Sequence, residues 1–500
     1  MSKRLIMDKK LVETYNILWK EQKLNIIRDY RLVLLKIIQK EKSNSLKKSA
    51  LMFYVNNHLN HPFTKELIKS ICYKKKVVYP LPNDLIFSIK KEGININVLK
   101  SKLQFKKLLI KSFFKGLLFL GKNICQKTEN FQKNSILFLN LSEKNLPFSK
   151  GSFETSIFSI ISKKAKFKNK ILYHNVTTKN KVFGVKYLNS FIPKTNFLNK
   201  IKCLTKSISD ILMSVIYFLN GEWWEIILTQ EKITNNFFRY ADKKNLANIY
   251  VLPDSNSIYK PLWIEEVEKR KIEVILYDYS MSNEPEPIKG VKSDINFISV
   301  RDWKVKLFLN KFSKNQYLKG NDKIITSYIS GNYDFETFNE VDFPLNKNYI
   351  IIYNLRIPTN YFGFSYLNDY KVFDVNNSKL FLDNIIEANN SKYKLYLKQK
   401  RLFNSNNYSQ ELENYIKKLV KQKKIEEFNP SLSNIKVSKS AKGIISYPFT
   451  STAHLAKKKN ASIYYDPTGK INTNDPARHG FELINNKLNL KRWIINLDNK

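Results

Sequence analysis

Residues 247–286 read ANIYVLPDSNSIYKPLWIEEVEKRKIEVILYDYSMSNEPE, and this stretch decides the fold class. Its opening ANIYVLP has the apolar, β-branched content of a buried strand, and IEVILYDYS at 272–280 repeats that texture. Between them, KPLWIEEVEKRK has the spacing of an amphipathic helix. A strand, a helix and a second strand in this order form a crossover unit, which joins parallel strands. The stretch therefore predicts a parallel α/β sheet.

The same alternation returns in the last third of the chain. Strands are predicted at 348–356, 370–376, 393–401, 443–448 and 461–467, and helices at 378–390, 409–424 and 451–460. Ser378 and Ser409 stand where a serine hydroxyl can accept hydrogen bonds from the free N–H groups of a helix start. Alternating elements favour a second doubly wound sheet.

These patterns divide the chain into three predicted regions. Residues 1–130 are very basic and mainly helical, and no motif that carries chemistry stands out in them. A first Rossmann-like domain is expected over 131–340, and a second over 341–500. A polar, charged region near 300–345 is expected to join the two sheets.

The composition is strongly basic. Lys and Arg total 86 against 43 Asp and Glu, which gives a formal net charge of +43 and suggests a polyanionic partner or an anionic membrane. The abundance of Lys, Asn and Ile is equally typical of AT-rich coding, so both explanations of the charge stay open. With 43% hydrophobic and 13% aromatic residues, the chain is not disordered.

Cysteine usage and hydropathy indicate a cytoplasmic protein. Cys72, Cys125 and Cys203 have no paired spacing, and the N-terminus lacks the apolar core of a signal peptide. No stretch has the ~20 apolar residues that span a bilayer. Residues 105–121 and 208–229 are basic or aromatic amphipathic segments, which favour either peripheral membrane contact or ordinary core helices.

The sharpest local motif lies at 446–453, SYPFTSTA, between a predicted strand and a predicted helix. Ligands bind at the carboxyl ends of strands in parallel sheets, and a helix start there offers free N–H groups and a positive dipole end. Thr450, Ser451 and Thr452 add hydroxyl groups, so the motif predicts a phosphate site. The alternative is that these hydroxyls only cap the helix.

Other polar residues in the last third are candidate ligand contacts. Asp374 ends an apolar strand, where a carboxylate can accept hydrogen bonds from ribose hydroxyls. Lys398 and Arg401 could meet a diphosphate, and His479 could meet a phosphate. A solvated basic cluster and a structural histidine are the alternatives.

Pro448-Phe449-Thr450-Ser451 resembles the motif of a bacterial family, the polysaccharide biosynthesis proteins named for PFTS. The similarity extends over about 245–480, through YVLPDSNSIYKPLW, YDYSMSNEP, KVFDV, IYYDPTGK and DPARHG. The resemblance implies a GT-B-like glycosyltransferase of two Rossmann-like domains, which works without a metal or a further cofactor. It implies a nucleotide-sugar donor as co-substrate, and a growing surface polysaccharide or its lipid-linked precursor as acceptor.

Sugar transfer of this kind needs a base for the acceptor hydroxyl. Asp254 and Glu284 follow the two strands of the 247–286 unit, so their loops open on the same edge of the sheet, and they are the predicted catalytic carboxylates. Each has a structural alternative, Asp254 as a turn residue and Glu284 as a surface charge.

Several familiar signals are missing from the sequence. It has no GxxxxGK[ST] or GxGxxG motif, and its five histidines lack metal-ligand spacing. A polyol-phosphate transferase with a CDP-linked donor is a neighbouring alternative, because it needs the same phosphate-gripping helix. A polyanion or membrane-surface binding protein without catalysis is the other. Dispersed basic residues and the lack of a nucleic-acid motif do not favour a nucleic-acid partner.

Overall fold

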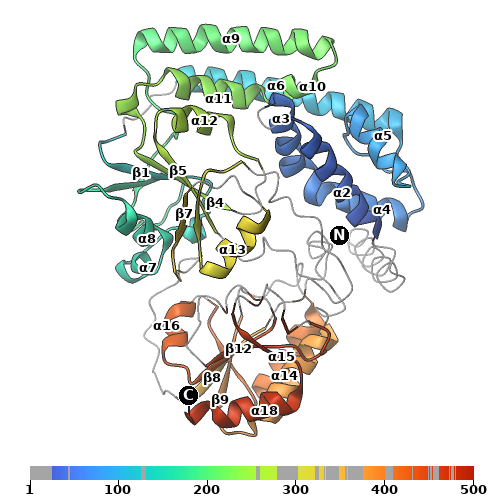
Figure 1. Ribbon diagram of the computed structural model, residues 1–500, viewed down its shortest axis with the longest axis vertical. Helices are drawn as coiled ribbons and strands as arrows, with labels where there is room; N and C mark the ends of the chain where they lie inside the picture. The colour runs from blue at the N-terminus through green and yellow to red at the C-terminus, as the bar shows by residue number, and fades with distance from the viewer. Residues whose placement is uncertain are drawn as a thin grey trace.

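The protein is described by a computed structural model. The described residues are 25–42, 45–125, 131–254, 259–278, 302–320, 326–331, 333, 348–354, 357, 375–399, 409–430, 432–448, 450, 453, 461–471, 473–474, 478 and 480–499. Figure 1 shows helices at one end of the molecule, a first sheet beneath them and a second sheet at the opposite end.

The first sheet has seven parallel strands in the order β3-β2-β1-β4-β5-β6-β7. They are β1 (Ser135–Phe138), β2 (Ile171–His174), β3 (Lys186–Tyr187), β4 (Ile249–Asp254), β5 (Glu273–Asp278), β6 (Val305–Phe308) and β7 (Thr326–Ile329). The predicted unit at 247–286 is confirmed, because β4 and β5 pair in parallel and α12 (Leu262–Lys269) joins them.

Helices cover both faces of this sheet. On one face, α11 (Thr229–Tyr240) and α12 place Phe238 and Trp263 in a cluster with Tyr250 of β4. On the other face, α8 (Ile157–Lys164) packs Phe158 against Phe138 of β1. A short helix, α7 (Lys150–Glu154), precedes α8. Burial on both sides explains why these strands are almost continuously apolar.

The first part of the predicted joining region belongs to the first sheet, so that prediction is wrong. Strands β6 and β7, with α13 (Lys311–Gly320) between them, extend the sheet by two strands. Lys306 breaks the apolar pattern of β6 in the sequence, yet its side chain is only 1% exposed and pairs with Asp278. A buried lysine is stable when it has such a partner.

The second sheet has six parallel strands in the order β10-β9-β8-β11-β12-β13. They are β8 (Tyr349–Tyr353), β9 (Lys394–Lys398), β10 (Glu426–Phe428), β11 (Gly443–Ser446), β12 (Ser462–Tyr465) and β13 (Glu482–Ile484). The helices α14 (Val375–Asn389), α15 (Gln410–Lys421) and α18 (Lys487–Ile495) cover one face, and α16 (Asn434–Lys439) covers the other. The prediction of two doubly wound sheets is confirmed.

Two local predictions in this sheet have different outcomes. The Ser409 hydroxyl accepts from Leu412 N at 3.3 Å, which confirms it as the cap of α15. Ser378 does not cap a helix, because α14 already begins at Val375 and Ser378 is buried inside it. The predicted strand at 370–376 is therefore wrong at its last two residues, and the rest of it lies outside the described residues.

The described part of the N-terminal region is helical, as predicted. It contains α2 (Asn25–Lys40), α3 (Leu46–Tyr54), a short π-helix at Val55–Leu59, α4 (Asn60–Cys72), α5 (Asn83–Lys91) and α6 (Val98–Cys125). These helices share a core with α10 (Trp223–Ile227), so the region packs as one body with helices of the first domain. Short 3₁₀ turns lie at Glu143–Asn145, Lys243–Asn245 and Asn496–Asn499.

A long helix, α9 (Phe197–Leu219), lies at the outer end of the molecule and packs on α11 (Figure 1). The segment 208–229 is thus two helices, because Gly221, with φ of +91°, ends α9 before α10 begins. Among the described residues, no helix combines the length and the apolar content that crossing a membrane requires.

Candidate functional site

The strand order of the second sheet identifies its ligand-binding edge. Numbered along the chain, its strands stand in the order 3-2-1-4-5-6, so the order reverses between β8 and β11. In open parallel sheets, ligands bind outside the carboxyl ends of the strands at this reversal. The edge formed by the ends of β8 and β11 is therefore the candidate site.

The predicted phosphate motif begins at this edge. Tyr447 follows β11, is fully buried, and its N–H donates to the carbonyl of Tyr353, the last residue of β8, at 2.8 Å. This hydrogen bond carries the pairing of β8 and β11 to Tyr447, the second residue of the 446–453 motif. Tertiary structure thus places Pro448 and Thr450 beside the end of β8.

Thr450 has a structural role at this edge. Its hydroxyl donates to the Tyr447 carbonyl at 2.7 Å, and its N–H reaches the same carbonyl at 3.2 Å, which closes a turn. Its own carbonyl accepts from the Tyr464 hydroxyl at 3.3 Å, and the residue is 5% exposed. Thr450 therefore fixes the turn and does not offer its hydroxyl proton to a ligand.

The loop after β12 is held by a buried carboxylate. Asp466 is fully buried and accepts from Thr468 N and Ile471 N, each at 2.9 Å, and from the Thr468 hydroxyl at 2.7 Å. Burial is the main cause that raises the pKa of the neighbouring Tyr465, whose hydroxyl also accepts from Asn384 at 2.8 Å. These residues shape the edge next to the motif.

The first sheet has the same kind of edge. Its strands stand in the order 3-2-1-4-5-6-7, and β4, at the reversal, ends at Asp254. Asp278 ends β5 and is the register partner of Asp254. The backbone thus places a predicted catalytic residue at the ligand-binding edge.

Sequence reasoning missed the buried pair of Asp278 and Lys306. The Lys306 ammonium lies 3.0 Å from one carboxylate oxygen and 4.0 Å from the centre of the Tyr317 ring. Leu309 N donates to the other carboxylate oxygen at 3.3 Å. Because both carboxylate oxygens have partners, Asp278 stabilises this edge of the sheet. We therefore assign proton transfer to other groups. The polar Asp at the end of ILYD was a signal for it.

His174, at the end of β2, was also missed. Its side chain is 1% exposed, and Nδ1 accepts from Val176 N at 3.2 Å, which leaves the proton of the neutral ring on Nε2. Burial lowers the pKa of His174, so the neutral form is favoured. Its place at a strand end was the available signal.

The two edges approach each other. Phe312 follows β6, and its ring lies so close to Gly480 that an added Cβ there would be 2.6 Å from it. Ile435, from α16 after β10, packs against the first-sheet cluster that contains Leu309. Phe312 follows β6 and Ile435 follows β10, whereas Gly480 lies just before β13, so each contact includes a residue that follows the carboxyl end of a strand.

The other predicted site residues have varied positions. Lys398 is 1% exposed, and its ammonium donates to the carbonyl of Pro430 at 2.7 Å, a role that belongs to the fold. The backbone of Asp254 is placed, but its side chain is not described. The predicted residues that lie outside the described residues are Glu284, Asp374, Arg401, Ser451, Thr452 and His479. Their roles stay predictions.

Within the part of the chain that the structure describes, no three His, Cys, Asp or Glu side chains gather as a metal site requires.

Comparison with known families gives one match. The model of a family described as polysaccharide biosynthesis PFTS motif protein matches residues 204–494. The match begins in α9, includes β4 to β13 and ends within α18. A search of curated proteins found no matching sequence.

Solved structures give only distant likenesses. S. aureus MnaA, determined with UDP, has a TM-score of 0.37 at 9% identity, covering 73% of this chain and 88% of that one. A sucrose-phosphate synthase from Thermosynechococcus elongatus has 0.37 at 9% identity, with 74% and 90% covered. A UDP-forming trehalose-phosphate synthase from Burkholderia vietnamiensis has 0.35 at 7% identity, with 73% and 89% covered. Scores this low leave the activity of the present chain to be argued from its own residues.

Proposed function

Because the chain belongs to the family of polysaccharide biosynthesis PFTS motif proteins, we propose that it is a glycosyltransferase. It transfers a sugar from a nucleotide-sugar donor to a growing surface polysaccharide or its lipid-linked precursor. The nucleotide sugar is a co-substrate, and the reaction needs no metal and no further cofactor. The enzyme works in the cytoplasm, at the inner face of the membrane.

One observation carries this proposal. The PFTS motif, the feature that names the family, follows β11 at the strand-order reversal of the second sheet. That edge is where a parallel sheet of this kind binds a nucleotide. Asp254 ends β4 at the corresponding reversal of the first sheet, which supports a role for it beside the acceptor.

The proposed reaction is a displacement at the anomeric carbon. The acceptor hydroxyl attacks this carbon, the bond to the phosphate oxygen breaks, and the nucleoside diphosphate leaves with the electron pair. Asp254 or Glu284 takes the hydroxyl proton. Backbone N–H groups and hydroxyls of the motif bind the charge that develops on the leaving phosphate.

On the donor side, each predicted residue has a separate role in binding the nucleotide sugar. Ser451 and Thr452 bind the phosphates, and Thr450 contributes through the turn that it closes. Asp374 contacts the ribose, while Arg401 and His479 meet the diphosphate. Lys398 supports β9 through the Pro430 carbonyl, so its part in donor binding is indirect.

A thermal-shift screen tests the donor site. UDP, CDP, GDP and CMP, with their sugar conjugates, are added to the full chain. A binding nucleotide at 100 times its Kd should stabilise the protein by about 2.7 kcal/mol. Ser451→Ala should remove this stabilisation without lowering the melting temperature of the free protein.

Thr450 variants supply the matched control. Thr450→Ala should weaken nucleotide binding and also destabilise the free protein, because the Tyr447 carbonyl loses its hydroxyl donor. Thr450→Ser keeps that donor and should restore both. If a CDP-polyol alone stabilises the chain, the polyol-phosphate alternative replaces the sugar transferase; if no nucleotide does, the donor site is refuted.

A further inference from the structure

Helix α9 turns a strongly apolar face away from the protein. Phe197 is 76% exposed, Leu212 60% and Leu219 77%, although α9 has 23 residues and packs on both α11 and α10. The exposed apolar side chains recur at helical spacing on one side. They are Phe197, Leu198, Ile201, Ile208, Leu212, Ile216 and Leu219.

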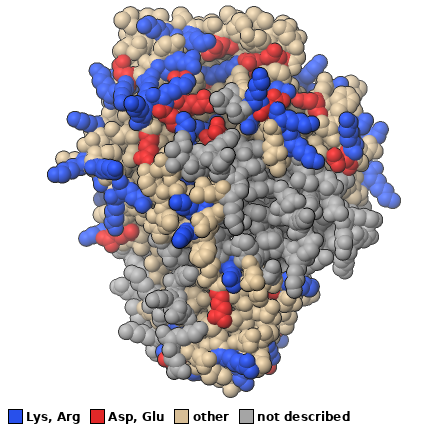
Figure 2. All heavy atoms as spheres, in the orientation of Figure 1, with Lys and Arg blue, Asp and Glu red and all other residues tan. Residues whose placement is uncertain are grey.

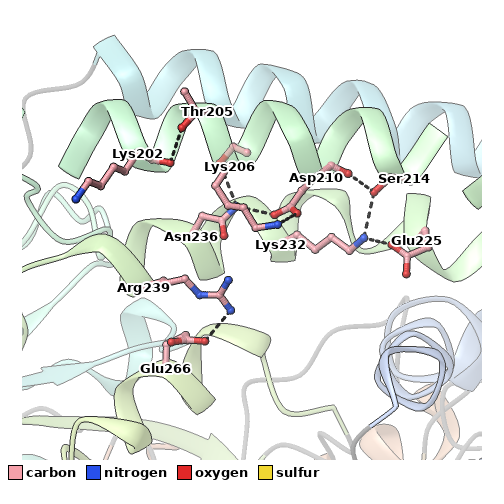
Figure 3. Close-up of polar contacts among 11 residues, drawn as sticks. Lys202, Thr205, Lys206, Asp210, Ser214, Glu225, Lys232, Asn236, Arg239 and Glu266 are labelled. Atoms are coloured by element: carbon pink, nitrogen blue, oxygen red, sulfur yellow. Dashed lines mark hydrogen bonds and ion pairs between the residues drawn. The ribbon is translucent and has the colours of Figure 1, made fainter. Parts of the chain in front are cut away.

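The face of α9 that packs on the protein mixes polar, small and apolar residues. Cys203, Ser207, Ile211 and Ser214 are buried there. Asp210 accepts from Asn236 of α11 at 2.8 Å, and Ser214 Oγ lies 3.1 Å from Lys232 Nζ. Figure 3 shows these contacts between the two helices.

An ordinary surface helix buries its apolar stripe and exposes its polar one. Helix α9 departs from this pattern, because polar residues occupy part of its buried face and several of its large aliphatic side chains remain in water. Contiguous exposed apolar surface of this kind marks an interaction site.

Helix α6 adds a second exposed apolar strip. Its Leu103, Ile110, Phe114 and Leu118 are each more than half exposed. Both α6 and α9 pack on α11, and both lie at the outer end of the molecule (Figure 1). Lys200 of α9 also donates to the carbonyl of Ile124 in α6 at 2.5 Å. We name the exposed side of these two helices the α6/α9 face.

Lysines accompany the apolar residues of this face. Helix α6 contains seven lysines and no acidic residue, and α9 contains three lysines and one acid, the inward Asp210. Lys106, Lys107 and Lys111 are exposed. In Figure 2 this end of the molecule is largely tan, with blue and red side chains next to it.

We propose that the α6/α9 face docks on the surface of a bilayer that contains anionic phospholipid. Helix α9 lies in the plane of the interface, with its aliphatic side chains at the acyl boundary and the α6 lysines on headgroup phosphates. The positive charge of the α6/α9 face favours an anionic bilayer as the partner. A second copy of the chain would bring the same lysines against each other, whereas an anionic bilayer offers both an apolar layer and the opposite charge.

This inference rests on the proposed function only for the side of the membrane at which the protein binds. The surface that makes contact is argued from α6 and α9. Vesicle binding needs neither donor nor acceptor, so the two can fail separately. Variants of the α6/α9 face should keep the nucleotide-induced thermal shift, because the donor site lies in the second sheet at the opposite end of the molecule (Figure 1).

Vesicle sedimentation with the full chain tests the apolar part. The probes are phosphatidylcholine vesicles with and without phosphatidylglycerol. Leu212→Glu with Ile216→Glu should weaken binding to the anionic vesicles by roughly tenfold for each residue. The matched control is Leu488→Glu with Ile495→Glu on α18, two similarly exposed apolar residues, which should bind as the unchanged protein does.

A second set of variants tests the charge. Replacing Lys106, Lys107 and Lys111 by Gln should weaken binding to anionic vesicles by about fivefold for each lysine. The same change at Lys417, Lys418 and Lys421 of α15 alters the net charge equally and should have little effect.

Three results would overturn the proposal. In the first, the α9 double variant binds as tightly as the unchanged protein while lysine removal anywhere weakens binding, which means adsorption by net charge. In the second, none of the vesicles binds. In the third, sedimentation velocity shows a dimer that the α9 variant dissociates, which identifies a second copy as the occupant.

Discussion

Gly443, the first residue of β11, lies close to the C-terminal helix and to the turn after it. A Cβ at this position would lie 2.9 Å from Leu497 and 3.0 Å from Trp493, both of which are buried. The glycine therefore lets α18 and the turn after it pack directly on the strand that leads to the PFTS motif.

Gly443→Ala should lower the free energy of unfolding by about 1–3 kcal/mol, because the added methyl overpacks this contact. Urea denaturation measures the loss. Leu497→Ala supplies the matched test, since its space should absorb the new methyl and the double variant should lose less than the two single losses combined. If the losses of unfolding free energy in the two single variants simply add in the double variant, the contact between Gly443 and Leu497 does not limit packing.

At the scale of elements, α11 and α12 are joined by a buried carboxylate. Glu231 of α11 accepts from the Tyr259 hydroxyl at 2.8 Å and from Leu262 N, at the start of α12, at 3.4 Å. Burial raises the pKa of Glu231 above 4.5, while these two hydrogen bonds act in the opposite direction. The folded protein therefore holds this proton to higher pH than the unfolded chain does.

The sign of the pH effect follows from this raised pKa. The stabilisation from Glu231 is complete below 4.5 and is lost as the pH rises through the folded-state pKa. Glu231→Gln cannot ionise, so its melting temperature relative to the unchanged protein should improve as the pH rises above 4.5. Melting curves over pH measure it, with Glu265→Gln on the exposed side of α12 as the control. Parallel pH curves for Glu231→Gln and the unchanged protein would contradict the prediction.

At the scale of the whole molecule, apolar side chains among the described residues join the two sheets. Ile435 packs on the core of the first sheet, and Phe312 lies against Gly480 of the second. The positive φ of Gly480, +80°, and the nearness of the ring both require glycine there.

Ile435→Glu should weaken the contact between the sheets by about 1–2 kcal/mol, because a carboxylate replaces an apolar group against the core. Small-angle scattering should then show a larger radius of gyration, with each sheet still folded by circular dichroism. Leu488→Glu, which adds the same charge on exposed α18, should leave the radius unchanged. An unchanged radius for Ile435→Glu would mean that other contacts hold the two sheets.

Much of the fold could be predicted because its strands carry local signals. The continuous apolar runs in ANIYVLP and NYIIIYNLR predict strands that are buried on both faces, and the helices between them show amphipathic spacing. Strand β6 was not predicted because Lys306 interrupts its apolar pattern. Lys306 can be buried in the core because it pairs with Asp278, which is distant in the chain. The cap at Ser378 failed because the helix starts earlier, at Val375.

The candidate site could be predicted in part. The sequence placed the PFTS motif and Asp254 at strand ends, which the strand order then brought to the ligand-binding edges. It could not show that the Thr450 hydroxyl donates to the Tyr447 carbonyl, or that the buried Lys398 donates to the Pro430 carbonyl. Both hydrogen bonds depend on the conformation of the loops.

By itself the sequence determined the alternation of strands and helices, the basic charge and the motif that marks the family, since each depends on residues near one another in the chain. Only the tertiary structure decided that α9 buries Ser207 and Ser214 and exposes Leu212 and Leu219. An amphipathic pattern gives a helix two faces, but which face turns inward depends on the surface it meets, and α11 offers Asn236 and Lys232 there.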